Sequence, residues 1–334
     1  MVRLGIVGAG KMGFGLARAL RSGLLQVNMQ VEAICDADAE TGKRASEELG
    51  VPAFTSVQEM VTQAALDAVY VAVPDALHRE PFEAAANAGL AILVEKPFAT
   101  TVDDAEAMLG AARRAGIVAE VNFSNRWNPP FVAAKLSIDA GEIGEVLSVN
   151  SRLNNAIGSP TKALAWAGQT TPAWFLLSHV LDLTTWLSGK QAVSVTANGV
   201  KRHLVSLGIP TYDYIHAMVR YADGSDGLYE STWVLPDSMP SPVDFKYEVV
   251  GTQGAIYIDT HDQMVHRAIN GGRYDHVSTL SWTEARMRAF AKRVSEHDSS
   301  LAQLEQGLEN TRILVALHEA LDGAVTVAIA GAYR

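Results

Sequence analysis

Three groups of residues have types and spacings that suit ligand binding or catalysis. The first is a glycine-rich run, GAGKMG at residues 8–13. The second is the tripeptide EKP at residues 95–97, and the third is SHVLD at residues 178–182. Together they suggest a dinucleotide site, an amine that transfers a proton and a polar face on a helix.

The glycine run has the spacing GxGxxG that receives the pyrophosphate of a dinucleotide. The first glycine permits a tight turn, the second lets the pyrophosphate approach the backbone, and the third lets the next helix pack closely. Free amides and the dipole at the start of that helix favour an anion. The alternatives are a glycine turn without a ligand and, for the lysine, a solvated loop residue. The expected cofactor-binding residues in this run are Gly8, Gly10, Lys11, Met12 and Gly13.

Asp36 ends the second apolar run of the chain, where a carboxylate can bind the 2′-hydroxyl of a ribose. The same carboxylate repels a 2′-phosphate, so the sequence predicts NAD rather than NADP. The alternative is that Asp36 is a cap or turn residue, because aspartate is favoured at such positions. Asp38 is the better candidate for the helix cap.

Lys96 follows a short apolar run that is expected to be a strand. Open α/β sheets bind ligands beyond the carboxyl ends of their strands, so Lys96 is expected beside the dinucleotide. Its amine can take a proton from an alcohol while hydride leaves the carbon, and can return it in reduction. Taken alone, Glu95-Lys96-Pro97 is more often an ion pair and a turn at the end of a strand.

His179 and Asp182 are three positions apart in a predicted helix, so they share a face. The neighbouring residues of this segment are mostly apolar. A histidine and a carboxylate in such a setting can form a proton relay or a substrate clamp. They can also form a hydrogen-bonded pair in the core. Spacing alone does not distinguish between these interpretations.

Short apolar runs alternate with helical patterns over the first 122 residues. The runs are nearly continuous in apolar residues, as in strands that are covered on both faces. The alternation predicts an α/β fold with a parallel, doubly wound sheet and right-handed crossovers. The expected strands are 3–7, 30–35, 66–73, 91–94 and 118–123, and the expected helices are 12–22, 38–49, 56–63, 78–88 and 101–115.

The pattern changes after residue 123. Helices are expected at 128–140 and 174–187, a strand at 146–154, and a loop over 155–172, which is rich in Gly, Ser, Thr and Pro. Alternating segments from 192 to 269, with turn signals at 222–224 and 251–254, predict an antiparallel sheet. Helices at 284–295 and 300–321 follow. We therefore expect a dinucleotide-binding domain at 1–122 and a substrate-binding domain at 123–334, whose C-terminal helix packs back on the first domain.

Composition excludes several classes of protein. Hydrophobic residues make up 48% of the 334 residues and charged residues 19%, which suits a buried core and not a disordered chain. The net charge is −10 and both halves are acidic, so we expect no nucleic-acid partner and no membrane partner. Cys35 is the single cysteine, which excludes an internal disulfide, and no metal site is expected. Because no run resembles a signal peptide or a membrane helix, we expect a cytoplasmic protein.

These motifs together resemble the Gfo/Idh/MocA oxidoreductase family, the group that contains glucose–fructose oxidoreductase and inositol dehydrogenase. The resemblance extends over nearly the whole chain. It is carried by the segments 8–13, 73–78, 94–98, 122–127, 178–182, 221–224 and 249–254.

The resemblance implies an N-terminal Rossmann domain and a C-terminal α/β domain with a large, mostly antiparallel open sheet, which commonly forms a dimer or tetramer interface. It implies oxidation of a secondary alcohol of a sugar or cyclitol, or reduction of the ketone. Lys96 matches the catalytic lysine and His179 the active-site histidine. The matched cofactor residues are Pro74, His78, Glu95, Lys96 and Asn122, and Arg126 matches a residue near the domain junction that is either a substrate or a structural contact.

The chain departs from the family pattern at the entry to the histidine helix. A carboxylate usually lies four residues before the histidine, and here that residue is Phe175. Residues 169–171 replace three glycines. Trp166 and Trp174 flank this entry, where they either pack or stack on a sugar. The expected substrate residues are Lys96, Arg126, Trp166, Trp174, Phe175, His179 and Asp182.

Three functions are compatible with this sequence. The leading one is an NAD(P)-dependent dehydrogenase of a sugar, an inositol or a related polyol, working as a homodimer or homotetramer. The second is an enzyme that retains NAD and uses transient oxidation to cleave a glycosidic bond. The third is a sensor that binds a dinucleotide and a partner protein without catalysis.

Overall fold

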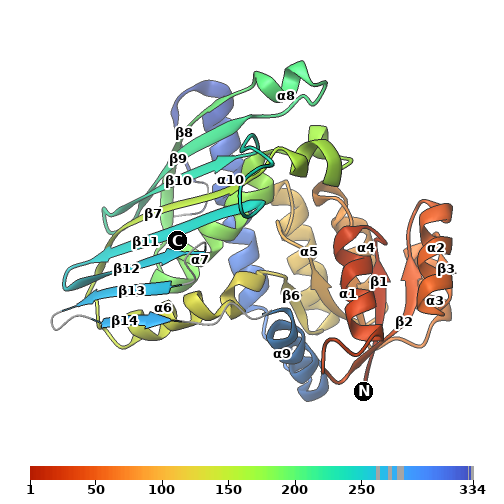
Figure 1. Cartoon of the computed structure of the whole chain (residues 1–334). Helices are drawn as coiled ribbons and strands as arrows, with labels where there is room; N and C mark the ends of the chain where they lie inside the picture. The colour runs from red at the N-terminus through yellow and green to blue at the C-terminus, as the bar shows by residue number, and fades with distance from the viewer. Residues whose placement is uncertain (261–263, 270–272, 277–281, 330, 332–334) are drawn as a thin grey trace. The chain divides into compact units, whose positions relative to one another are not determined.

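The computed structural model of the protein describes residues 1–260, 264–269, 273–276, 282–329 and 331. It contains two compact units. The first joins Met1–Ser124 to Trp282–Thr311, and the second joins Asn125–Ser281 to Arg312–Arg334. Figure 1 follows the chain through both units.

The first unit is built on a six-stranded parallel sheet. Its strands lie in the order β3-β2-β1-β4-β5-β6, which is the order of dinucleotide-binding sheets. The strand interiors are almost entirely buried, as their apolar sequences predict. The bounds are β1 Val2–Val7, β2 Met29–Cys35, β3 Ala53–Phe54, β4 Ala68–Val71, β5 Ala91–Val94 and β6 Ala119–Val121.

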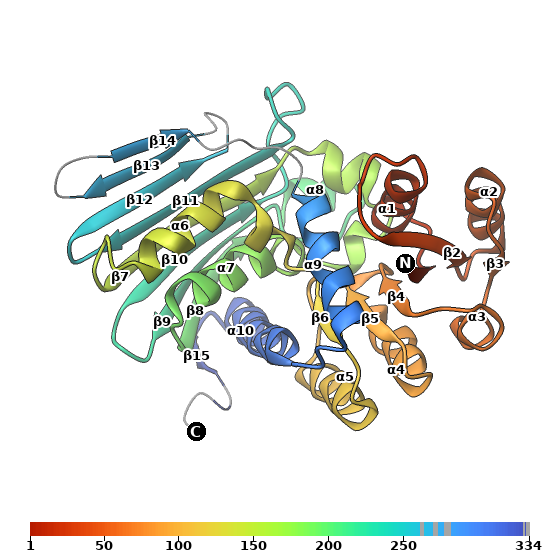
Figure 2. The same ribbon diagram turned by 90° about the horizontal axis from the view of Figure 1, so that it is seen from below.

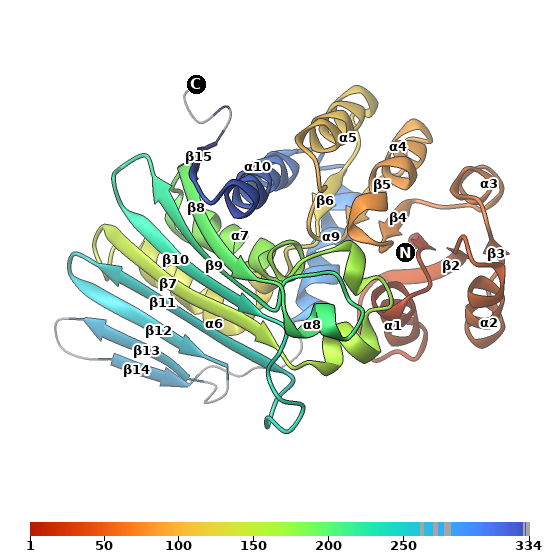
Figure 3. The ribbon, with the colours of Figure 1, turned by 90° about the horizontal axis from the view of Figure 1, so that it is seen from above.

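Helices cover both faces of this sheet. One apolar core contains residues of α1 (Lys11–Arg21), α2 (Ala39–Leu49) and α9 (Thr283–Glu296). The other contains residues of α3 (Val57–Gln63), α4 (Arg79–Asn87), α5 (Val102–Ala115) and the beginning of α10 (Ala302–Gly323). Helices α4 and α5 lie side by side in Figures 2 and 3. Helix α9 and the beginning of α10, which come late in the chain, thus complete the helical layers on the two faces of this sheet.

The helix ends in this unit follow from local chemistry. Asp38 caps α2, where its carboxylate accepts a hydrogen bond from the amide of Glu40, as expected. Gly50 ends the same helix with a φ of 64°, a conformation that glycine adopts without strain. Thr101 and Gly116 begin and end α5 in the same way.

The second unit contains a nine-stranded sheet in the order β14-β13-β12-β11-β7-β10-β9-β8-β15. Its neighbouring strands are antiparallel except for the central pair of β7 and β10, which is parallel. The bounds are β7 Val146–Asn155, β8 Ala192–Val200, β9 Tyr214–Tyr221, β10 Asp226–Thr232, β11 Val243–Gly251, β12 Gly254–Asp259, β13 Met264–Ile269, β14 Arg273–His276 and β15 Thr326–Ala328.

One face of this sheet packs on helices. Its core contains residues of α6 (Pro129–Asp139), α7 (Ser178–Ser188) and the second half of α10. Strand β9 alternates strictly between exposed and buried residues, as in a strand with one solvated face. In the described part of the chain no helix lies over the opposite face, which is turned to the viewer in Figure 3. We refer to it as the open sheet face.

The fold class predicted from the sequence is confirmed, and most elements begin and end within a few residues of their expected bounds. The differences are local. Three short strands (β3, β14 and β15) and the four-residue helix α8 (His203–Ser206) were not predicted, since so few residues show no clear period. The helix expected at 174–187 begins with a π-helical turn, Ala173–Leu177. Short helical turns at Ser159–Ala163 and Ala167–Gln169 interrupt the expected loop.

Membrane-spanning helices and metal-binding clusters are absent from the residues that the structure describes. No helix there is both long and apolar enough to cross a bilayer. No three side chains of His, Cys, Asp or Glu lie close enough together there to hold a metal ion.

Candidate active site

The glycine loop between β1 and α1 has the geometry of a dinucleotide-binding turn. Gly8 has a φ of 96°, and a Cβ there would lie 2.4 Å from the carbonyl oxygen of Ala72. A Cβ at Gly13 would lie 1.9 Å from the carbonyl oxygen of Gly8. Both positions therefore require glycine. At Gly10 a Cβ would meet no described atom within 4 Å, so this side of the loop is open to a ligand.

The N-terminus of α1 fits the pyrophosphate of NAD. Gly10 provides no side chain to cap the first turn, and that turn contains no acidic residue. Its amides are therefore available to an anion, and the helix dipole favours negative charge there. Lys11 and Met12 are exposed at this turn.

Asp36 fastens the glycine loop to the end of β2. Its Oδ2 accepts a hydrogen bond from the amide of Ala9 at 2.8 Å, and its Oδ1 accepts one from Asp38 at 2.9 Å. The residue is half-buried, and each carboxylate oxygen can accept more than one hydrogen bond. The side chain thus holds the turn and still has acceptor capacity for ribose hydroxyls.

His78 is buried at the start of α4 and is 1% exposed. Its Nδ1 lies 3.2 Å from the carbonyl oxygen of Phe98, and its Nε2 lies 3.2 Å from that of Val73. The imidazole therefore bridges the loops that follow β4 and β5. Pro74, in the first of these loops, is half-buried.

Glu95 and Lys96 follow β5, as predicted. The carboxylate of Glu95 is buried and accepts hydrogen bonds from the hydroxyl of Tyr70, the side-chain amide of Asn122 and the backbone amide of Lys96. Lys96 itself is half-buried. Sequence reasoning missed Tyr70, although it is the single hydroxyl-bearing residue in the apolar strand β4.

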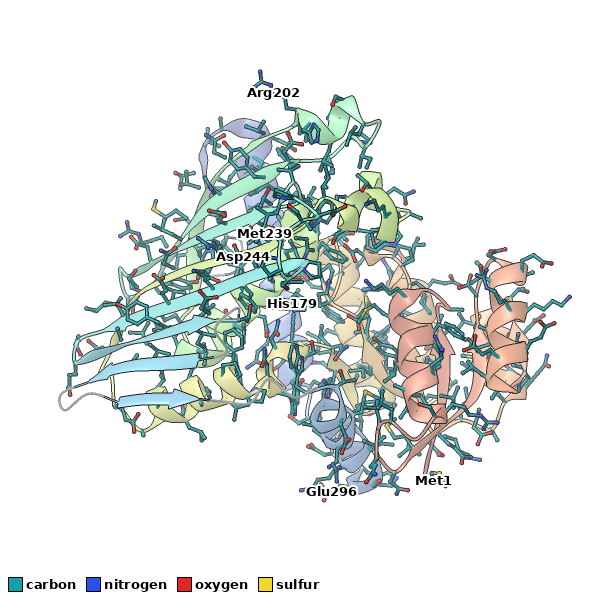
Figure 4. All side chains as sticks on the ribbon, in the orientation of Figure 1. Met1, His179, Arg202, Met239, Asp244 and Glu296 are labelled. Atoms are coloured by element: carbon teal, nitrogen blue, oxygen red, sulfur yellow. The ribbon has the colours of Figure 1, made fainter. Side chains whose placement is uncertain are left out.

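The second unit places His179 in the first turn of α7 (Figure 4) and Asp182 one turn further on. Asp182 pairs with Arg126, whose Nε lies 3.0 Å from Oδ2 and whose Nη2 lies 2.5 Å from Oδ1. Both side chains are almost fully buried. Burial raises the pKa of the Asp182 carboxyl, although the guanidinium acts in the opposite direction. Two expected substrate residues are thus brought together in a buried ion pair.

Aromatic side chains surround the entry to α7. Phe175 contacts Trp166 edge to face at 6.2 Å between ring centroids, and contacts the fully buried Trp233 at 5.6 Å. Trp174 is separate from this group and stacks on His318 at 4.6 Å. The position four residues before His179, where the chain departs from the family pattern, therefore has apolar surroundings. Trp233 and His318 were not predicted, because their contacts join elements that are distant in sequence.

His318 connects α10 to the segment before α7. Its Nδ1 lies 2.7 Å from the carbonyl oxygen of Leu314, and its Nε2 lies 2.8 Å from the hydroxyl of Thr171. A neutral imidazole satisfies both contacts by donating through Nδ1 and accepting at Nε2. Burial lowers the pKa of His318 to about 4, more than the Leu314 carbonyl raises it.

We expect this histidine to make the protein less stable in mild acid. Because its pKa is about 4 in the folded state and about 6.5 when unfolded, the unfolded chain binds the proton first. The free energy of unfolding should fall by roughly 3 kcal/mol as the pH drops from about 6.5 to about 4. Urea titrations across this pH range should show that the free energy of unfolding depends less steeply on pH in His318→Gln than in the wild type. The exposed His203→Gln is the control, and an identical slope in all three proteins would contradict the prediction.

Two family models match the chain. Residues 2–123 match a model described as "Oxidoreductase family, NAD-binding Rossmann fold", and residues 131–257 match "GFO/IDH/MocA C-terminal domain". The inositol 2-dehydrogenase 2 of Saccharopolyspora erythraea is 32% identical over 257 residues, which cover 76% of this chain and 72% of the relative. The scyllo-inositol 2-dehydrogenase (NAD(+)) of Bacillus subtilis is 25% identical over 279 residues, covering 82% and 79%.

A solved structure shows the same fold. The apo scyllo-inositol dehydrogenase from Lactobacillus casei matches with a TM-score of 0.84 at 21% sequence identity, over 99% of each chain. The glycine loop, the strand order and these matches define an NAD-binding oxidoreductase with a Rossmann domain. More particularly, the chain belongs to the GFO/IDH/MocA oxidoreductase family, as its motifs predicted.

Proposed function

We propose that this protein is an NAD-dependent dehydrogenase that oxidises a secondary alcohol of a sugar, an inositol or a related polyol, or reduces the matching ketone. Inositol dehydrogenases among its relatives support this substrate class. The observation that carries the proposal is Lys96, which lies two residues beyond the end of β5 in a sheet whose first turn suits NAD. Ligands of such sheets bind beyond the carboxyl ends of the strands.

Bound NAD supplies the acceptor for the hydride that leaves the alcohol carbon. The residues of this chain manage the proton and the orientation. The Lys96 amine takes the hydroxyl proton in oxidation and returns it in reduction. His179 orients the same hydroxyl and assists the transfer. Gly8, Gly10 and Gly13 receive the pyrophosphate, and Asp36 binds the ribose.

The proposal is tested by mixing the purified protein with NAD and a panel of cyclitols, sugars and polyols. Absorbance of the reduced nicotinamide should rise with at least one member of the panel. NADP should serve much less well, because Asp36 repels a 2′-phosphate. Tight binding of NAD without turnover on any member would instead favour the sensor.

A second candidate is an enzyme that retains NAD and cleaves a glycosidic bond through transient oxidation. Phe175 favours it, since this ring stands where the family usually has a carboxylate and contacts two further aromatic side chains. This candidate predicts that NAD co-purifies with the protein. It also predicts that a glycoside is consumed with no net gain of reduced nicotinamide.

We also propose that the open sheet face forms a homodimer or homotetramer interface. Leu228 on β10 and Met218 on β9 are direct neighbours on this face and are 51% and 37% exposed. Further large apolar side chains, Val250 and Tyr257, are exposed on β11 and β12. Exposed apolar surface of this kind is typical of subunit contacts.

Sedimentation velocity tests the interface. The wild-type protein should sediment as an oligomer, and Leu228→Glu should shift it towards the monomer because it buries a charge in the contact. Leu136→Glu is the matched control, since Leu136 is exposed on α6, on the helical side of the sheet. A monomeric wild type, or a Leu228→Glu oligomer as stable as the control, would contradict the proposal.

A further inference from the structure

The carboxylate of Glu95 is buried in the first unit, 6% exposed, and collects three hydrogen-bond donors. Its Oε1 accepts from the hydroxyl of Tyr70 and, at 2.7 Å, from Nδ2 of Asn122. Its Oε2 accepts from the backbone amide of Lys96 at 3.2 Å. A buried carboxylate is costly unless it is well hydrogen-bonded, and this one has donors on both oxygens.

Tyr70 is the least accessible of these donors. It lies inside β4, one residue before Val71, whose carbonyl accepts the amide of Glu95, and it is 2% exposed. Burial raises the pKa of Tyr70 well above its usual value and the neighbouring Glu95 carboxylate raises it further, whereas Asn122 and Arg286 act in the opposite direction. The phenol therefore stays protonated and donates its hydrogen bond to the carboxylate throughout the working pH range.

This arrangement links a residue of the sheet interior to the backbone of Lys96. A hydrogen bond that ends on an ionised group is stronger than a neutral one and has a better defined direction. Tyr70 holds one oxygen of Glu95 in place, and the other oxygen holds the Lys96 amide. An amine that is 1 Å out of place loses much of its effect in proton transfer.

We propose that Tyr70 is a positioning residue, which acts through Glu95 to hold the peptide of Lys96 in its reactive place. The inference rests on the proposed role of Lys96 as the acid–base group. Tyr70 reaches neither substrate nor cofactor, because it is enclosed in the sheet. Its hydroxyl is the single side-chain polar group in β4.

The test compares Tyr70→Phe with Tyr221→Phe. Tyr221 is the matched control, because its hydroxyl is equally buried and bonded, in this case to the hydroxyl of Tyr229 at 2.6 Å in the second unit. In Tyr70→Phe, kcat should fall about tenfold, as expected for loss of one hydrogen bond to a charged group. The KM values for NAD and for the alcohol should stay within about twofold, because a positioning residue contributes no ligand contact. Tyr221→Phe should keep the wild-type kcat.

Hydrogen exchange gives a second readout that does not depend on activity. The backbone amide of Lys96 should exchange about tenfold faster in Tyr70→Phe than in the wild type, because its acceptor is less firmly held. Exchange at this amide should not change in Tyr221→Phe. If the wild type shows no dehydrogenase activity, the proposed function fails, and the exchange rate alone then decides whether Tyr70 holds this peptide.

Several outcomes would overturn the inference. An unchanged kcat in folded Tyr70→Phe would do so, as would an unchanged exchange rate at Lys96. A raised KM for NAD with an unchanged kcat would show a cofactor contact instead. If Tyr70→Phe does not fold, Asn122→Ala removes the other donor to the same oxygen. It should also lower kcat and speed exchange at the Lys96 amide, and failure to do either would count against the inference.

Discussion

Replacing Lys96 by alanine should lower kcat by a factor of about 10² to 10⁴, the usual contribution of a positioned acid–base group. The alcohol must lose its proton as hydride leaves, and without the amine that proton goes to water. Most contacts to NAD are expected from the glycine loop and Asp36, so the dissociation constant for NAD should change far less than kcat. Steady-state kinetics and NAD titration of the same preparation measure both quantities.

Lys43→Ala is the matched control for this variant. Lys43 is exposed on α2, and removing its charge changes the net charge of the protein equally. It should retain full activity. A Lys96→Ala enzyme with more than about a tenth of the wild-type kcat would contradict the acid–base role. The family membership, which rests on sequence matches, would stand.

Removing the guanidinium of Arg126 should destabilise the second unit by about 3–5 kcal/mol, because it leaves the carboxylate of Asp182 buried without its counter-charge. Arg126→Met keeps most of the side-chain volume. Most of the tryptophans lie in the second unit, so tryptophan fluorescence in a urea titration reports mainly on that unit. The loss of stability should be smaller at low pH, since protonation neutralises the unpaired carboxylate of Asp182.

The double variant Arg126→Met/Asp182→Leu separates charge from packing. Replacing both members of a buried ion pair by apolar residues is often close to neutral, whereas breaking the pair is costly. The double variant should therefore be more stable than Arg126→Met. Two outcomes would contradict this account of the ion pair. The free energy of unfolding of Arg126→Met could fall by less than about 1 kcal/mol, or the double variant could be less stable than Arg126→Met.

The sequence by itself determined the features that depend on residues close together in the chain. The glycine run could be recognised from the sequence because two of its requirements are local: Gly8 adopts a positive φ, and Gly13 packs against the carbonyl of Gly8. The apolar runs predicted strands covered on both faces, and their alternation with helices predicted the parallel sheet. Lys96 could be placed at the carboxyl end of a strand for the same reason.

The tertiary structure decided which polar side chains meet. Asp182 shares a helix with His179, and its carboxylate pairs with Arg126, which lies 56 residues earlier in the chain. Likewise Trp174 stacks on His318 of the last helix, whereas Trp166 lies against Phe175. Helical periodicity predicts the face of the helix on which a residue lies. It does not predict which other element packs against that face.

In the first unit, too, the partners of buried polar side chains could not be predicted from the sequence. Glu120 in β6 pairs with Arg286 and Arg293 of α9, more than 160 residues further along the chain. Tyr70 of β4 likewise finds its partner in Glu95, which follows the neighbouring strand β5. A buried polar group must find its partner wherever the folded chain provides one. Such partners are therefore set by packing and not by spacing along the sequence.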